Sequence, residues 1–141
     1  MRFETASAAE TEAAGAELAR RLVRGDTVFV SGELGSGKTT FIRGACRALE
    51  VKGRVTSPTF AIGQLYVGEA GGAPIEIAHL DLYRLDSAPD EDQELLEDYL
   101  TGERIGFVEW PGELVTQLTR VAARVRIDHA GADCRRSIEI A

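Results

Sequence analysis

The segment from Gly32 to Thr40 has the residue types and spacing of a phosphate-binding loop. It reads GELGSGKTT and fits the pattern G-x-x-x-x-G-K-[ST] at every specified position. Gly32, Gly35 and Gly37 allow backbone conformations that a side chain would block, so successive N–H groups can point at an anion. The segment therefore predicts a site that holds a polyphosphate.

The two residues after the last glycine have side chains suited to a nucleotide. Lys38 offers a slim ammonium to the β- and γ-phosphates, and the Thr39 hydroxyl suits a magnesium ion. Lys38 is one of two lysines, against fourteen arginines, and a forked guanidinium does not easily replace an ammonium in such a pocket. The alternative is a glycine-rich turn that merely precedes a helix, and the complete motif disfavours it.

The residues on either side of the loop predict the strand and the helix that must position it. Thr27–Val30 is a short apolar run typical of a buried strand. Phe41–Leu49 continues as a helix with apolar residues on one side, and its positive end adds to the attraction for phosphate.

A second chemical feature is the acid at the end of Ile105–Glu109, a hydrophobic run that predicts another strand. If this strand lies beside the loop's strand, Glu109 emerges at the edge where open α/β sheets bind ligands. A carboxylate there can hold magnesium directly or through water. The alternative is a solvated acid at a strand end, and the presence of the loop favours the functional role.

The segment from His79 to Arg84 offers another acid. In an extended conformation His79 and Asp81 share one face and the intervening leucines share the other. Asp81 is predicted to position water or to bind magnesium through a water molecule, and its alternative role is a structural partner of Arg84. His79 alone is predicted to be a structural histidine.

Three hydroxyl residues and a proline follow the loop's helix at 56–59. Their composition alone describes an ordinary turn, but their place after the helix is that of a segment that senses the γ-phosphate. In that role Ser57 and Thr59 contact phosphate or water when the segment closes. The residues themselves leave both interpretations open.

The rest of the chain predicts one α/β domain with a P-loop NTPase-like mixed sheet, a parallel centre with antiparallel additions, flanked by helices. Segments 59–67 and 74–83 are expected to form a hairpin with a rather long connection at 68–72. The other expected elements are helices over 8–23 and 90–100 and strands over 1–4, 104–110, 121–130 and 135–141.

Composition limits the partners of this 141-residue chain. Its net charge of −7 argues against broad binding to nucleic acid or to a membrane surface, but leaves open a local basic patch or an RNA reached through a partner. The two cysteines lack metal-ligand spacing, and Cys46 is expected to be a buried thiol. Neither a secretion signal nor an apolar run of membrane-spanning length is present, which favours the cytoplasm.

Four motifs occur in order: GELGSGKTT from Gly32, SPTF from Ser57, HLDLYRL from His79 and EWP from Glu109. Together they resemble those of the bacterial tRNA threonylcarbamoyladenosine biosynthesis ATPase family TsaE, formerly called YjeE. The resemblance extends from the first helix to about Pro111, and the last thirty residues add little to it.

The resemblance implies a small ATPase that binds ATP and Mg²⁺ and works with a larger assembly. The implied partners are a threonylcarbamoyl transferase (TsaD-like) and its noncatalytic paralogue (TsaB-like), which together modify adenosine 37 of tRNAs that read codons starting with A. The ATPase would reset or activate this complex rather than form the adenylate, and it would meet tRNA through the complex. Weak activity in isolation is expected.

The resemblance also implies roles for individual residues. Lys38, Asp81 and Glu109 would serve catalysis, Thr39 and Glu109 would hold magnesium, and Ser57 to Phe60 would act as a switch. Ala8 to Thr11 would line the pocket for the base, and Arg135 and Arg136 would lie near nucleotide or partner. The residues that would hold phosphate are Gly35, Ser36, Gly37, Lys38, Thr39 and Thr40.

Two other classes of function stay open on the sequence. A small-molecule kinase is one, although the chain shows no arginine-rich lid insertion and leaves little length for an acceptor pocket; phosphate release without an added acceptor would argue against it. The other is a nucleotide-dependent interaction switch with incidental hydrolysis. A Glu109→Ala variant that binds ATP and partner and supports full tRNA modification would favour that switch.

Overall fold

The computed structural model describes residues 1–33, 35–56, 63–82, 90–111, 115, 119–131 and 134–141, without the side chains of 90–93. Within these residues the chain forms a seven-stranded mixed sheet in the order β1-β7-β6-β2-β5-β4-β3. The strands are β1 (Arg2–Thr5), β2 (Thr27–Gly32), β3 (Gly63–Ala70), β4 (Ala73–Asp81), β5 (Arg104–Glu109), β6 (Val121–His129) and β7 (Arg136–Ile140). The helices are α1 (Ala8–Ala19), α2 (Lys38–Ala48) and α3 (Asp90–Tyr99).

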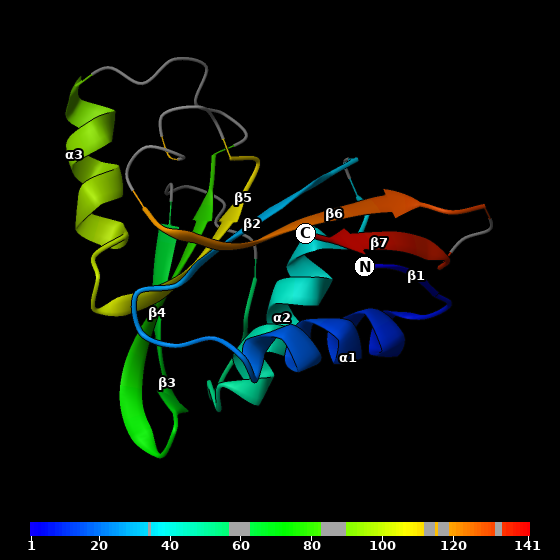
Figure 1. Ribbon diagram of the computed structural model, residues 1–141, viewed down its shortest axis with the longest axis horizontal. Coiled ribbons are helices and arrows are strands. Elements are labelled where there is room, and N and C mark those ends of the chain that lie inside the picture. Colours follow the sequence, from blue (N-terminus) through cyan, green and yellow to red (C-terminus); the bar gives the residue numbers. More distant parts are fainter. Residues whose placement is uncertain (34, 57–62, 83–89, 112–114, 116–118, 132–133) are drawn as a thin grey trace.

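The centre of the sheet is parallel, as predicted. Strand β2 lies between β6 and β5 and runs parallel to both, and β5 also runs parallel to β4. The outer pairs β3–β4, β6–β7 and β1–β7 are antiparallel. The amino and carboxy termini therefore lie side by side, and the Met1 ammonium donates a hydrogen bond to the Ile140 carbonyl (2.9 Å; Figure 1).

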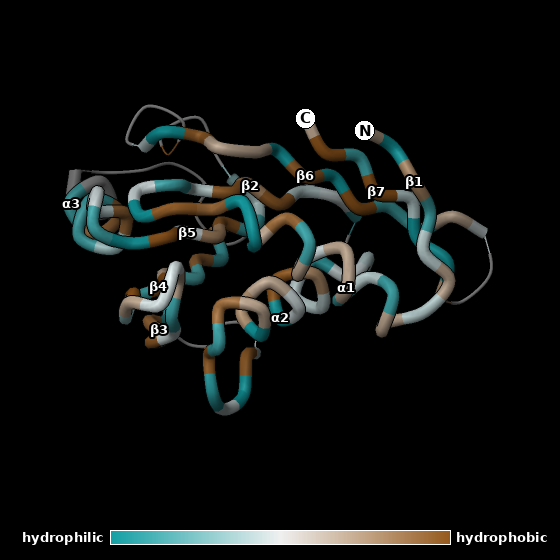
Figure 2. The backbone as a smooth tube through the Cα atoms, turned by 60° about the horizontal axis from the view of Figure 1, so that its bottom comes forward, coloured by the Kyte–Doolittle hydropathy of each residue, from teal (hydrophilic) through white to brown (hydrophobic). Residues whose placement is uncertain are grey.

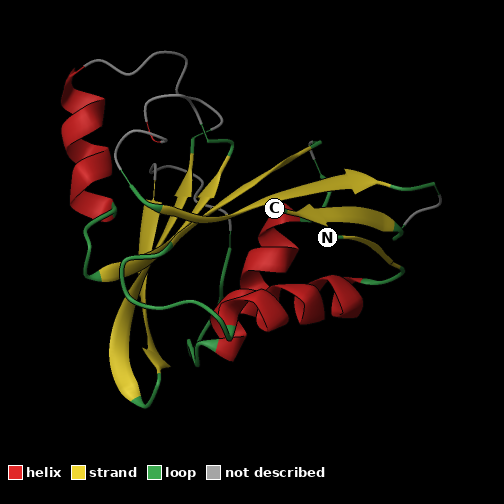
Figure 3. Cartoon of the chain, in the orientation of Figure 1, coloured by secondary structure: helices red, strands yellow, loops and turns green. Residues whose placement is uncertain are grey.

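The helices cover the two faces of the sheet unequally. Helices α1 and α2 cross each other on one face, and α3 stands on the other (Figures 1 and 3). The backbones of α1 and α2 come so close that a Cβ atom on Gly15 would lie 2.0 Å from the Phe41 carbonyl oxygen. Hydrophobic stretches run along the central strands, and the connections are more hydrophilic (Figure 2).

Alternating side chains of β2 divide the interior into two hydrophobic clusters. Val28 and Val30 join a large cluster beneath α1 and α2, and Phe29 joins a smaller one beneath α3. Cys46 is fully buried in the larger cluster, as expected. No described helix is long and apolar enough to cross a membrane.

The helix ends differ from the expected boundaries. Helix α1 ends at Ala19 instead of Val23, because the N–H groups of Arg21 and Leu22 bond to carbonyls three residues back and tighten the chain into a turn. Asp26 then accepts a hydrogen bond from the Val23 N–H (2.9 Å). Helix α2 begins inside the loop motif at Lys38, before the expected Phe41.

The strand predictions also need correction. The hairpin connection was expected over 68–72, but β3 runs to Ala70, which pairs with Ala73, so only Gly71 and Gly72 form the turn. Strand β4 ends at Asp81 and β5 at Glu109; Trp110 leaves the strand with a φ of 56°. Strand β6 ends at His129, one residue earlier than expected. Strand β7 begins at Arg136 and ends at Ile140, one residue shorter than expected at each end. Residues 59–62 and 83, which were expected to belong to the hairpin, lie outside the described residues.

Candidate functional site

The acids of the site are brought together by the register of the parallel strands. Asp81 at the end of β4 pairs with Glu109 at the end of β5, and Glu109 also pairs with Val30 of β2. Because strand side chains alternate, both acids continue the rows that pack beneath α2. These rows are Ile75, Ile77, His79 and Asp81 on β4, and Ile105, Phe107 and Glu109 on β5.

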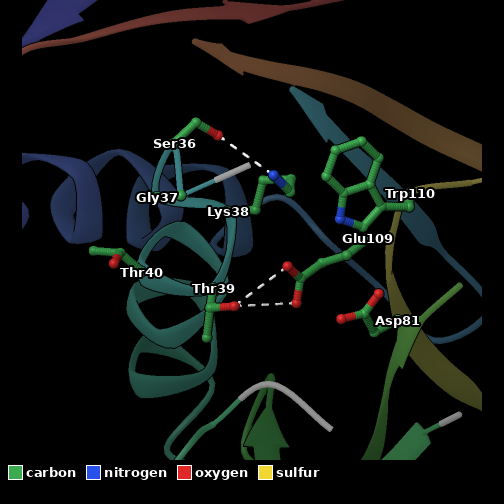
Figure 4. A pocket seen from close by; sticks show the side chains of 9 residues that line it. Ser36, Gly37, Lys38, Thr39, Thr40, Asp81, Glu109 and Trp110 are labelled. Atoms are coloured by element: carbon green, nitrogen blue, oxygen red, sulfur yellow. Dashed lines mark hydrogen bonds between the residues drawn. The ribbon is translucent and has the colours of Figure 1, made fainter. Parts of the chain in front are cut away.

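The loop between β2 and α2 faces the same edge of the sheet. Gly37 caps α2 with a left-handed φ of 106° and offers no side chain to the first amides, at the end of the helix that attracts anions. A cavity of about 310 Å³ lies between the loop and the acids (Figure 4). It is lined by Gly35, Ser36, Gly37, Lys38, Thr39, Thr40, Asp81, Glu109 and Trp110.

Lys38 is buried at the wall of this cavity. Its Nζ donates to the carbonyls of Gly32 (3.2 Å) and Glu33 (2.7 Å) and lies 4.3 Å from the centre of a Trp110 ring. Burial lowers the pKa of the Lys38 ammonium, and nearby carboxylates, Glu109 foremost, oppose that shift. The ammonium is thus a cation held inside a concave, partly apolar site.

Thr39 and Glu109 join the loop to the central strands. The Thr39 hydroxyl lies 3.2 Å from each oxygen of the Glu109 carboxylate, although the two residues are 70 positions apart in the chain. Glu109 is 3% exposed, and the Asp81 carboxylate lies beside it in the same space (Figure 4). A hydroxyl and a carboxylate in contact provide the hard oxygen atoms that Mg²⁺ prefers.

The side chains at the site can be compared with the ligands that a magnesium ion needs. No group of three or more histidine, cysteine, aspartate or glutamate side chains among the described residues is arranged to hold a metal ion alone. Mg²⁺ commonly uses one or two protein oxygens and completes its shell with phosphate and water. Thr39 and Glu109 fit that arrangement, and phosphate held by the loop would supply further oxygens.

Other predicted residues lie on the far side of the loop. Ala8 and Thr11 border a second cavity of about 70 Å³ together with Gly37, Thr40, Cys134 and Arg136. Thr11 is buried, and its hydroxyl is 2.7 Å from that of Thr5; Ala8 is exposed. Thr40 points away from Glu109 (Figure 4) and lines both cavities. Ser57 and Thr59 fall outside the described residues.

Three contacts at the site were not assigned by sequence reasoning. His79 Nε2 is 2.6 Å from Glu109 Oε2, the Trp110 ring lies against Lys38, and Arg136 Nε donates to the Ser36 carbonyl (2.7 Å). Of these, the alternation of β4 could have placed His79 on the face of Asp81, but the contact with Glu109 depends on the register between β4 and β5. Arg135, expected near nucleotide or partner together with Arg136, is exposed.

The loop between β2 and α2, set in a mixed sheet with a parallel centre, defines a P-loop fold. The crystal structure of YdiB from Bacillus subtilis resembles this chain with a TM-score of 0.73 and 28% identity, covering 98% of this chain and 82% of that one. The family described as "Threonylcarbamoyl adenosine biosynthesis protein TsaE" matches residues 5–138.

Individual relatives agree. The tRNA threonylcarbamoyladenosine biosynthesis protein TsaE of Streptomyces coelicolor is 43% identical over 119 residues, 84% of this chain and 79% of that protein. The protein of the same description from Bacillus subtilis is 32% identical over 136 residues, 96% and 82% of the two chains. The chain belongs to the TsaE family, and its role lies in tRNA threonylcarbamoyladenosine biosynthesis.

Proposed function

We propose that this chain binds ATP with Mg²⁺ at the cavity between the loop and the acids, and that it hydrolyses the ATP in support of the modification of adenosine 37 in tRNA. The contact between Thr39 and Glu109 carries the proposal most directly. It brings the hydroxyl expected at magnesium to a buried acid at the edge of the sheet, immediately beside the phosphate-binding motif.

Each residue then has a chemical role that follows from its position. The amides at the start of α2 bind phosphate oxygens, and the Lys38 ammonium turns from the loop carbonyls to the β- and γ-phosphates. Thr39 and Glu109 hold Mg²⁺, which when bound neutralises charge that develops on the phosphates. Asp81 orients water near the γ-phosphate or bonds to water on the metal.

The proposed place of the reaction is a larger assembly. A TsaD-like transferase and a TsaB-like paralogue are the partners, and tRNA is reached through them. The chain does not form the adenylate, but its ATP turnover resets or activates the transferase complex. Weak turnover by the chain alone is expected, because a partner can order the groups that complete catalysis.

The test measures phosphate release from ATP by the full chain, alone and with the transferase pair and tRNA. The Lys38→Ala variant should lose at least about 100-fold in rate, the scale expected when one charge-stabilising donor is removed. Lys52→Ala is the matched control, because Lys52 is the other lysine and is exposed. Equal turnover by the Lys38 variant would refute the assigned site, and ADP formation that requires an added acceptor and releases no free phosphate would indicate a kinase.

A further inference from the structure

His79 is a fully buried imidazole that contacts the proposed magnesium ligand. It lies on β4 with 0% of its surface exposed, and its Nε2 is 2.6 Å from Glu109 Oε2. The Glu109 carboxylate is also buried, and desolvation of a carboxylate is costly unless hydrogen bonds replace water. Thr39 contacts the same carboxylate at the longer distance of 3.2 Å, so His79 makes the shorter of these contacts.

The acceptor character of the Glu109 carboxylate favours one tautomer of a neutral His79 ring. A neutral imidazole has one N–H group, and a donor at Nε2 matches the acceptor oxygen of Glu109. Nδ1 then remains an acceptor, and the Tyr66 hydroxyl lies 3.5 Å from it. The imidazole therefore lies between a carboxylate and a phenol.

The Tyr66 hydroxyl contacts both His79 and the segment that follows α2. Its oxygen is 2.7 Å from Gln64 Oε1, 3.4 Å from the Thr56 carbonyl and 3.5 Å from His79 Nδ1. Burial raises the pKa of Tyr66, so the phenol keeps its proton at neutral pH. The phenol has one proton, and Gln64 Oε1 at 2.7 Å is the nearest of its three neighbouring acceptors, with the Thr56 carbonyl and His79 Nδ1 further away.

We propose that His79 is a positioning residue that fixes the Glu109 carboxylate toward Thr39, and that the Tyr66 hydroxyl beside Nδ1 helps to hold the imidazole in place. The proposal rests on the proposed function, because it assigns Glu109 to magnesium. A carboxylate held at one oxygen by His79 directs its remaining lone pairs to the Thr39 side, where the metal is expected. Without that hydrogen bond the carboxylate loses the shortest of the contacts described above, and its geometry for Mg²⁺ is weakened.

The first test uses binding instead of turnover. Trp110, the single tryptophan, lines the cavity, so its fluorescence should report binding of ADP to the full chain with Mg²⁺ and with EDTA. His79→Phe keeps a buried ring without a donor, and His79→Gln places an amide N–H near the position of Nε2. His79→Phe should lose roughly 10- to 100-fold of the gain in affinity that Mg²⁺ provides, with affinity in EDTA unchanged, and His79→Gln should recover most of it.

The outcomes separate this inference from the proposed function. Wild-type affinity that is the same with Mg²⁺ and with EDTA would contradict the proposed function itself. A wild-type gain that His79→Phe retains in full would overturn the role of His79, as would a His79→Gln variant that loses as much as His79→Phe. Tyr66→Phe should lose a smaller part, roughly two- to tenfold, and an unchanged gain would overturn the role of Tyr66 in holding the imidazole.

A second measurement keeps the proposal testable if His79→Phe does not fold. The chain has two histidines, so ¹⁵N NMR of the imidazoles gives few signals, and a His129→Gln variant assigns them. His79 should show a protonated Nε2 and an unprotonated Nδ1, and both signals should shift when Mg²⁺ and ADP are added. An unprotonated Nε2 would overturn the proposal, because Glu109 would then receive no hydrogen bond from His79.

Discussion

The two faces of the sheet differ in how they are packed and in what they carry. Beneath α1 and α2 a large cluster extends from the first helix to β7, whereas the cluster beneath α3 is smaller and centres on Phe29, Leu96 and Val108. The inward rows of β4 and β5 on the α2 face end in Asp81 and Glu109. The candidate site is thus an extension of the face with the larger cluster, so the packing there positions the site.

The largest expected effect is on the free energy of unfolding, and it compares alanine substitutions at two glycines, Gly32 and Gly102. A Cβ atom on Gly32 would lie 1.8 Å from the Ile127 carbonyl oxygen, and its φ of 139° disfavours any side chain. Gly32→Ala should reduce the free energy of unfolding by at least about 4 kcal/mol, the scale of severe core disruption. Gly102, on the connection from α3 to β5, has open space, and Gly102→Ala should change stability by less than about 1 kcal/mol. Denaturant titration measures both, and equal effects would contradict the packing argument.

The second prediction compares one core residue from each face. Ile42 of α2 and Leu96 of α3 are both buried, and replacement of either by alanine should cost about 2–5 kcal/mol of unfolding free energy. Only Ile42→Ala should also weaken binding of ADP, because Ile42 follows Lys38 and Thr39 on the helix that begins the site. Fluorescence titration of each folded variant measures its affinity for ADP. A comparable loss of affinity in Leu96→Ala would contradict the assignment of the site to the α2 face.

The smallest expected effect concerns pH. Burial lowers the pKa of Lys38, so between that pKa and its ordinary value of about 10.4 the unfolded chain binds more protons than the folded chain. The contribution of Lys38 to the free energy of unfolding therefore rises with pH in this alkaline range. Denaturant midpoints measured from pH 8 to 10.5 should show a rise in the wild type relative to Lys38→Met. Lys52→Met, at an exposed lysine, should follow the wild type, and a fall in the wild type relative to Lys38→Met would contradict the assignment.

The parts of this structure that depend on neighbouring residues were predictable, and the parts that depend on distant pairing were less so. The motif around Lys38 and the strand that ends at Glu109 are local patterns, and their elements were predicted with boundary errors of a few residues. The contact of His79 with Glu109 depends on which strand lies beside β4 and in what register. Likewise, nothing local to Arg136 indicates the Ser36 carbonyl, 100 residues away.

The end of the first helix is a boundary that the local apolar pattern predicted wrongly. Leu22 continues the apolar spacing of α1 and is buried, yet it lies in a turn instead of the helix. Periodicity reports that a side chain faces the interior, and a turn can place it there as well as a helix can. The position of the Gly71–Gly72 turn was also predicted wrongly. The connection was expected to start at Gly68, but β3 continues through it to Ala70.

The separation of Thr39 and Glu109 in the sequence has a consequence for synthesis on the ribosome. The loop emerges early, but its acidic partner is polymerised 70 residues later, roughly 4 to 14 seconds at typical bacterial and eukaryotic elongation rates. During that interval the nascent chain has a phosphate-binding motif without the strand that completes it. If nucleotide binds there as proposed, it can stabilise the complete site only after β5 has joined β2.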